Sequence, residues 1–432
     1  MIEENTNKLF SYFRTRLVKN SFYTGVALIF IGLTPFIFNF FIGRTFGAET
    51  LGSINIIINF CLIITIFISN FFGSAGNKYL AEFRGRNYLD NFLYTFKIIF
   101  FGSTFFLIII GIVLYVNWNY FFNKFSLPEN LLIPIIFYIF LRTIYVLLRK
   151  TLYGMDLVRH YTYNEIFAAI FMFAMIGYVC YNNVPNFLIH TYLVSYFIFL
   201  ILCIFTLSKN FKKTTSSMDR INNFSKNDVL KEFSQYGLIS MVGTVASTGT
   251  GYLSVIVTGM YLNHLEAGVY TAVLSIVSIL MFFPKLFIQV FLPEFSKLFG
   301  EGAKKKIVQI FKQTFFILFL FSLVTCLILL FLSDHILMLF GQDFSGGSTI
   351  LKIILPSLFI RMISIPCNAF LSGTKYILIP NIGGIIILLV SSFLWFLLVP
   401  NYNGLGIAIG YSLGITIGIG YQIFASIFKL KS

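Results

Sequence analysis

Long apolar runs separated by short polar segments make up most of the chain after residue 20. A helix that crosses a lipid bilayer needs about 20 mostly apolar residues, so each run of that length predicts one membrane span. The runs cover residues 21–43, 52–73, 97–117, 131–149, 165–182 and 186–207, and then 236–261, 268–292, 313–333, 349–371, 377–399 and 404–428. The pattern therefore predicts an all-α integral membrane protein with twelve transmembrane helices.

The positions of the basic residues predict the orientation of these spans. Short loops on the cytoplasmic side of a membrane carry an excess of Lys and Arg. If the N-terminus is cytoplasmic, the Lys and Arg residues outside the spans fall in inside segments, and only Arg44 and Lys124 lie in outside loops. A missed or extra span would scramble this alternation. We therefore expect an even number of spans and two cytoplasmic termini.

The longest polar stretch divides the spans into two sets of six. Residues 208–234 are rich in Lys, Ser, Thr and Asn, and they are expected to form a cytoplasmic linker. The predicted organisation is an N-terminal six-helix lobe at residues 1–207, the linker at 208–234, and a C-terminal six-helix lobe at 235–432.

Three short sequence echoes indicate that the two halves are repeats. The members of each echo are separated along the chain by nearly the same interval, so the three echoes belong to one register. Because each half has an even number of spans, the repeats are expected to be parallel and related by an axis along the membrane normal. The echoes are Tyr79–Phe83 with Phe291–Phe295, Arg142 and Gly154 with Arg361 and Gly373, and Leu51–Ile54 with Ala267–Tyr270.

The composition agrees with a membrane protein and argues against a soluble protein, a nucleic-acid-binding protein or an enzyme. Of the 432 residues, 58% are hydrophobic and 11% are charged, whereas soluble domains have roughly 25% charged residues. The net charge of +15 is explained by basic inside loops, so we expect no nucleic-acid partner. The five Cys and four His residues show no metal-ligand spacing. No enzyme motif or nucleotide-binding loop is present either. We therefore expect no enzymatic activity, metal or cofactor.

Basic residues inside the spans are the candidate site, because charges in a membrane are costly and mark function by default. Arg142 and Arg361 lie near mid-span at equivalent repeat positions, and Lys285 follows Pro284, where a kink would free a backbone carbonyl. Lys352 is close to a span end and is expected to reach the headgroups.

Helical spacing adds two amides to this set. Gln289 shares a helical face with Lys285, and Asn368 shares one with Arg361. Cations without partner acids suit an anion such as a phosphate or diphosphate, which Arg binds bidentately. Glu165, expected at the inner end of its span, is the nearest candidate for a buried acid. The competing interpretation is that the arginines bind helix-end carbonyls and only fix helix positions.

Two stretches and the overall organisation resemble the polysaccharide flippases (Wzx type) of the multidrug/oligosaccharidyl-lipid/polysaccharide exporter superfamily. Gly43–Gly52 is similar to the first outer loop of that family, and Phe291–Lys297 is similar to its eighth-helix exit. The resemblance covers nearly the whole chain. It implies a V-shaped MATE-like transporter fold built from two six-helix halves.

The resemblance also implies a function. It predicts that the protein moves undecaprenyl-diphosphate-linked oligosaccharide units for O-antigen, capsule or lipopolysaccharide biosynthesis from the cytoplasmic to the periplasmic leaflet of the inner membrane. Arg142, Lys285 and Arg361 would hold the diphosphate or acidic sugars. Implied partners are this lipid-linked oligosaccharide, membrane lipid and a polysaccharide polymerase.

Three alternatives remain open from the sequence. A multidrug exporter of the same superfamily would share the fold, but cationic drugs require acids within the spans. A polysaccharide polymerase or ligase would carry a large periplasmic loop, which the predicted topology lacks. A peptidoglycan-precursor flippase usually has two further spans.

Overall fold

The computed structural model describes residues 2–125, 131–216, 218, 225–281, 284, 287, 295, 298, 303–374, 376 and 378–431. Within these ranges the chain is helical and contains no β-strand. The long helices are α1 (Ile2–Gly85), α5 (Leu132–Gly154), α6 (Val158–Tyr181), α7 (Leu188–Thr215), α8 (Lys226–Tyr261), α11 (Lys304–Met338) and α14 (Leu378–Lys431). The shorter ones are α2 (Leu89–Lys97), α3 (Ser103–Val116), α4 (Trp118–Phe125), α9 (His264–Leu280), α12 (Gly347–Ile363) and α13 (Ile365–Gly373).

Two of the long helices each supply two membrane spans. The helix α1 is broken at Gly47, whose φ of 80° and ψ of 179° lie outside the helical region, and α14 is broken at Asn403, with φ 47° and ψ −131°. A positive φ costs glycine little and is tolerated by asparagine, so these residue types suit a sharp reversal. With each arm taken as one span and α12–α13 as one bent span, the described helices confirm the predicted all-α fold of twelve helices.

The helices continue beyond the apolar runs that predicted them. The segment around Gly47, expected to be an outer loop, is helical apart from the break itself. At the predicted linker, α7 runs to Thr215 and α8 begins at Lys226. The Ser225 side chain caps α8 by accepting a hydrogen bond from the Asp228 N–H at 3.3 Å. The predicted linker is therefore helical at both ends. Hydropathy marks the apolar part of a helix, whereas a helix ends where its backbone hydrogen bonds end.

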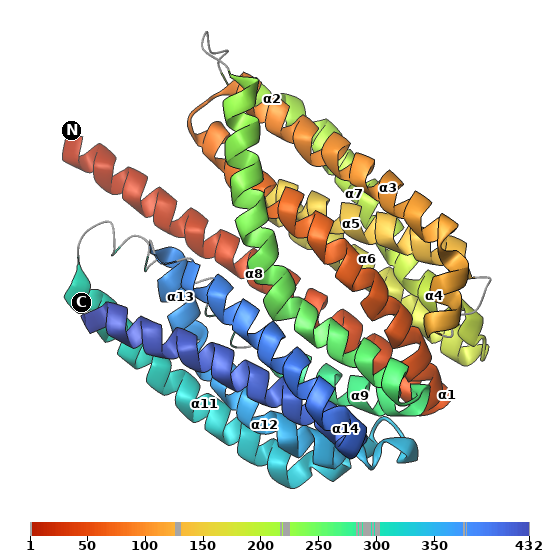
Figure 1. Ribbon diagram of the computed structural model, residues 1–432. Coiled ribbons are helices and arrows are strands. Elements are labelled where there is room, and N and C mark those ends of the chain that lie inside the picture. The colour runs from red at the N-terminus through yellow and green to blue at the C-terminus, as the bar shows by residue number, and fades with distance from the viewer. Residues whose placement is uncertain are drawn as a thin grey trace.

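Figure 1 shows the helices lying side by side, with α2–α7 grouped on one side and α11–α14 on the other. The helix α1 contacts both α5 and α6 of the first group and α8 and α9, while α8 also packs against α14. One hydrophobic core runs through both groups, and it includes Phe38 and Tyr138 from the first half and Tyr270 and Leu351 from the second. The helices α1, α8 and α9 therefore connect the two groups.

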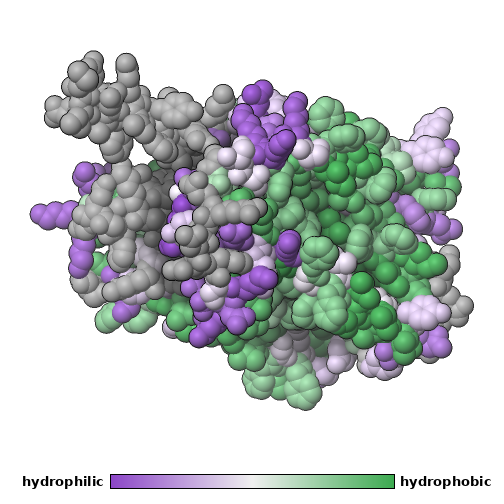
Figure 2. Space-filling model, turned by 90° about the horizontal axis from the view of Figure 1, so that it is seen from above, coloured by the Kyte–Doolittle hydropathy of each residue, from purple (hydrophilic) through white to green (hydrophobic). Residues whose placement is uncertain are grey.

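The outer surface is strongly apolar. Figure 2 shows a broad hydrophobic area, with hydrophilic residues in a band near the middle of this view and at its right edge. The most exposed large side chains include Phe101, Phe331, Phe396 and Phe424. Exposed apolar area of this extent is not tolerated in water but is suited to lipid tails. The protein is thus a multi-span membrane protein, as predicted.

The two arms of α14 pack through glycines. A Cβ added to Gly414 would overlap the hydroxyl of Ser391 and lie 2.9 Å from the Ile387 carbonyl oxygen. At Gly418 a Cβ would lie 2.6 Å from the carbonyl oxygen of Gly383. Small residues four apart let two membrane helices approach until their backbones touch. The last two spans are therefore held together by shape rather than by large side chains.

Candidate functional site

A cavity of about 470 Å³ lies among α1, α5, α6, α7, α8, α9, α12 and α14. It therefore draws side chains from both groups of helices. Its polar lining residues include Asn39, Asn55, Asn59, Tyr138, Arg142, Tyr145, Glu165, Tyr192, Ser195, Tyr196, Ser247, Thr248, Tyr252, Thr271, Ser275, Ser278, Arg361 and Tyr411. Both of the predicted mid-span arginines belong to this lining.

Arg142 is held inside a group of tyrosine rings. The spacing of Tyr138, Arg142 and Tyr145 along α5 places them on one face of that helix. The guanidinium carbon of Arg142 lies 5.1 Å from the ring centroid of Tyr145 and 5.3 Å from that of Tyr196, so it contacts two aromatic faces. Its Nη1 donates to the Tyr196 hydroxyl at 3.2 Å. The contacts fix the side chain while using one of its five N–H groups.

Arg361 makes the equivalent contact in the second half. Its Nη1 donates to the Tyr411 hydroxyl at 3.3 Å, from α12 to the second arm of α14. Tyr196 and Tyr411 are separated along the chain by nearly the same interval as the two arginines, so the whole Arg–Tyr pair is duplicated. Within the described residues neither arginine has an acidic partner in contact. Two fixed cations therefore face one cavity with N–H groups left to bind a ligand.

Three other site residues were predicted, namely Lys285, Gln289 and Asn368. Lys285 and Gln289 lie outside the described residues. Asn368 is half-buried on α13 and does not line the cavity. The chain bends by 42° between α12 and α13. The straight-helix spacing that placed Asn368 on the face of Arg361 therefore does not hold.

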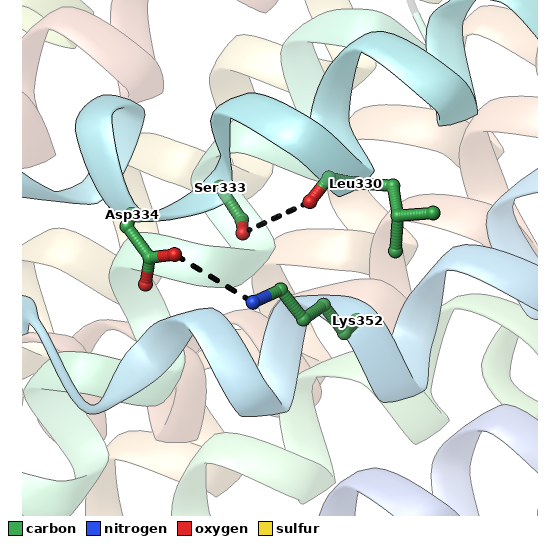
Figure 3. Close-up of polar contacts among 4 residues, drawn as sticks. All are labelled: Leu330, Ser333, Asp334 and Lys352. Carbon is green, nitrogen blue, oxygen red and sulfur yellow. Dashed lines mark hydrogen bonds and ion pairs between the residues drawn. The ribbon is translucent and has the colours of Figure 1, made fainter.

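Lys352 forms an ion pair away from the cavity. Figure 3 shows Lys352 of α12 reaching Asp334 of α11, with Ser333 and Leu330 beside them, and the Nζ–Oδ2 distance is 3.6 Å. The two side chains are 42% and 57% exposed, so the pair lies on the protein surface. Its separation from the cavity agrees with its exclusion from the candidate site.

Glu165 corrects the expectation that no acid accompanies the arginines. It lies inside α6, is buried and lines the cavity. The Tyr145 hydroxyl donates to one carboxylate oxygen, and the other is buried without a hydrogen-bond partner. The ring of Tyr145 in turn contacts both Arg142 and Arg149. Glu165 lies farther from the helix end than predicted, because α6 begins at Val158, before the apolar run.

Asparagines extend the polar lining across the two halves. Asn39 donates to the Ser275 hydroxyl at 2.8 Å, and Asn55 donates to the Asn39 side-chain oxygen at 3.0 Å. Asn39 and Asn55 come from the two arms of α1, whereas Ser275 comes from α9. All three are buried, so these bonds are shielded from competition by water. They join the two arms of α1 to each other and to α9 next to the cavity.

The tyrosines and asparagines of the lining were not among the predicted site residues. One signal for the tyrosines was present, because Tyr196 and Tyr411 obey the same repeat register as the arginines. For the asparagines no comparable signal existed, since an Asn in an apolar run can face lipid, a neighbouring helix or a cavity. Among the described residues no group of three or more His, Cys, Asp or Glu is placed to hold a metal ion.

Comparisons with known proteins identify the fold. Residues 239–398 match the MatE family model, while curated proteins give no significant match. The inward-facing structure of a multidrug resistance MATE family transporter of the MOP superfamily superposes with a TM-score of 0.73 at 12% identity, over 95% of this chain and 94% of that one.

Two further solved structures agree over almost the full length. A MATE protein in the bent conformation gives a TM-score of 0.70 at 12% identity, over 97% of this chain and 95% of that one. A MOP superfamily transporter from Pyrococcus furiosus, described as having a binding pocket of reverse polarity, gives 0.67 at 14% identity, over 96% of each chain. The chain therefore has the fold of the MATE transporters of the MOP superfamily.

Proposed function

We propose that this protein is a flippase for lipid-linked oligosaccharide repeat units, which it moves across the inner membrane by alternating access. The transported molecule would be an undecaprenyl-diphosphate-linked oligosaccharide used for O-antigen, capsule or a related polysaccharide. The observation that carries this proposal is the pair of duplicated Arg–Tyr contacts facing one cavity.

The chemistry of the two arginines favours a diphosphate. A guanidinium presents a planar fork of donors that matches phosphate oxygens. Among the described residues, Arg142 and Arg361 each donate a side-chain hydrogen bond to a neutral tyrosine hydroxyl. Their charges are therefore not cancelled by direct ion pairs. A ligand with two linked phosphate groups would offer one group to each arginine. The Asn, Ser and Tyr side chains around them provide the donors and acceptors that sugar hydroxyls need.

The arrangement of helices favours alternating access between two lobes. We propose the lobes at residues 1–207 and 235–432, with the segment between them as the connection. Arg142 belongs to the first lobe and Arg361 to the second. A ligand that binds both would sit at their interface, which is where transporters built from parallel repeats place their substrates. The lipid tail would stay in the bilayer beside the apolar outer surface.

Deleting the gene and locating the lipid-linked sugar units tests this proposal. We expect the units to accumulate in the cytoplasmic leaflet and surface polysaccharide to be lost. Single units accumulating in the outer leaflet would instead indicate a polymerase or ligase. If neither pool changes, the substrate is a different one and the proposal is wrong.

A multidrug exporter is the second candidate. The multidrug MATE structures share this fold, and Glu165 supplies the acid that organic cations require. Six tyrosines line the cavity, and their ring faces attract cations. Against this candidate, the two arginines outnumber the one acid in the described lining, so an organic cation would meet net positive charge.

Glu165→Gln distinguishes the two candidates. The amide oxygen can still accept from the Tyr145 hydroxyl, so the geometry is kept while the negative charge is removed. For a flippase we expect the purified protein to bind undecaprenyl diphosphate several-fold more tightly, because the variant removes the repulsion between the Glu165 carboxylate and the phosphate groups. Binding of ethidium, an organic cation, is the matched measurement. An exporter would lose ethidium binding in this variant and show no gain for the diphosphate.

A further inference from the structure

Two helix backbones from the two halves come into direct contact where the second arm of α1 crosses α9. A Cβ added to Gly52 would overlap the carbonyl oxygen of His264 and lie 2.7 Å from the backbone nitrogen of Gly268. A Cβ added to Gly268 would overlap the carbonyl oxygen of Ala48 and lie 3.0 Å from the nitrogen of Gly52. The two backbones therefore touch with no side chain between them.

This crossing is reciprocal. Each glycine meets the carbonyl of the residue four positions before the other glycine, since Gly52 meets His264 and Gly268 meets Ala48. Gly52 and Gly268 are as far apart along the chain as Ala48 and His264, and the echo of Leu51–Ile54 in the second half has this same separation. In a two-fold contact the same patch on both partners faces itself in this way. The pseudo-two-fold axis of the repeats thus passes through the Gly52–Gly268 contact.

The crossing lies at one end of the cavity. One and two turns further along the same helices, Asn55 and Asn59 of α1 and Thr271 and Ser275 of α9 line the cavity. In the repeat register Asn55 corresponds to Thr271, and Asn59 to Ser275, because each pair has the same separation along the chain as the two glycines. The contact between the glycines therefore lies at the end of the cavity nearest the first reversal of the chain, in α1, which is predicted to face the outside.

Two further layers of contact join the halves at this end. The first is the hydrogen bond from Asn39 to Ser275. The second is aromatic, because the ring centroid of Phe340 lies 6.1 Å from that of Phe36 and 5.4 Å from that of Phe40. The hydrogen bond runs from α1 to α9, whereas the aromatic contacts run from α1 to the segment that follows α11, so both break when α1 moves away from the second half.

We infer that the Gly52–Gly268 crossing is the gate at the outer end of the cavity, closed in this structure, and that it opens when α1 and α9 separate. The inference rests on the proposed transport by alternating access, but it makes a separate claim about which residues close the cavity. Backbone carbonyls cannot move aside as the end of a flexible side chain can. A single methyl group at either glycine therefore prevents closure, while alanine leaves each helix intact.

The test measures access to the cavity rather than transport. The five native cysteines are replaced by serine, and Ser278, which is exposed and lines the cavity, is changed to cysteine as the reporter. A membrane-impermeant maleimide is then added to spheroplasts and, separately, to inside-out vesicles. We expect Gly52→Ala and Gly268→Ala each to raise labelling in spheroplasts several-fold and by the same factor, because the contact is reciprocal.

Matched controls come from glycines with free space around them. A Cβ added to Gly177 or Gly420 has no neighbour within 4 Å, so Gly177→Ala and Gly420→Ala should leave labelling unchanged. Unchanged labelling in both test variants, or a response from only one of them, would overturn the gate. A rise found only in inside-out vesicles would overturn its assignment to the outer end.

A cross-link makes the test independent of any folding defect in the alanine variants. Asn39→Cys with Ser275→Cys replaces two side chains that bond across the halves. Oxidising these two thiols to a disulfide with copper phenanthroline, which takes up the two electrons and leaves the reporter thiol free to react, should hold the gate closed and abolish labelling of the reporter from outside. Labelling that continues after bridging would contradict the gate. None of these readouts needs the substrate, so an incorrect substrate assignment would leave the result intact.

Discussion

Arg142→Gln and Arg361→Gln should each lower transport of the lipid-linked oligosaccharide at least tenfold while the protein remains inserted in the membrane. A hydrogen bond to a charged group contributes about 1.5–3 kcal/mol, and each change removes the charge and the forked donor geometry together. The two effects should be similar in size, because the structure gives each arginine the same contact to a tyrosine hydroxyl. Rates of surface polysaccharide recovery in a deletion strain measure the effect, with immunoblots of membranes as the check on insertion.

Two further variants make this result specific. Lys352→Gln removes an equal charge from the surface pair with Asp334 and should leave the rate unchanged. Arg142→Lys keeps the charge but loses the bidentate fork, so it should retain only part of the activity. If both glutamine variants restore polysaccharide at the wild-type rate, the arginines only fix helix positions and the cationic-cavity mechanism is wrong.

Gly414→Leu and Gly418→Leu are expected to prevent stable folding of the last two spans. Any side chain at these positions meets the backbone of the opposite arm of α14, including the carbonyl oxygens of Ile387 and Gly383. Overpacking by a single methylene group in a tight interface costs about 1–3 kcal/mol, and a leucine adds several such groups. The purified variants should therefore aggregate or give a much lower melting temperature in detergent, together with reduced membrane abundance.

Alanine substitutions test the same contact between the two arms of α14 with a smaller added volume. Gly414→Ala should lower the melting temperature measurably, since even its Cβ overlaps the Ser391 hydroxyl. Gly420→Ala lies in the same arm, where an added Cβ has no neighbour within 4 Å, and should be neutral. A melting temperature for Gly414→Leu equal to that of Gly420→Ala would show that the two arms are not packed as described.

The spans were predictable because hydropathy is a local property. Backbone groups in a bilayer must bond within their own helix, so a run of about 20 apolar residues is sufficient to predict a spanning helix. Hydropathy placed the ends of the helices too early or too late wherever polar residues continue a helix beyond the membrane, as at Thr215 and Lys226. The misplacement of Glu165 followed directly from one such boundary.

Part of the cavity was also predictable. A charge in a span is costly enough to stand out from its surroundings, and the repeat register linked Arg142 to Arg361. Asn368 was predicted to share a helical face with Arg361, but the bend between α12 and α13 interrupts that face. For Lys285 and Gln289 the site assignment stays a prediction, since both lie outside the described residues.

The sequence by itself determined the helix count, the internal repeat and the two arginines. Only the tertiary structure decided which faces of the helices meet. It placed Glu165 beside Tyr145, paired each arginine with its tyrosine, and brought Gly52 against Gly268. The physical reason lies in the solvent. In water the apolar face of a helix identifies its buried side, whereas in lipid both the outer and the packed faces are apolar. Hydropathy then carries no information about rotation, and close packing of particular shapes decides it.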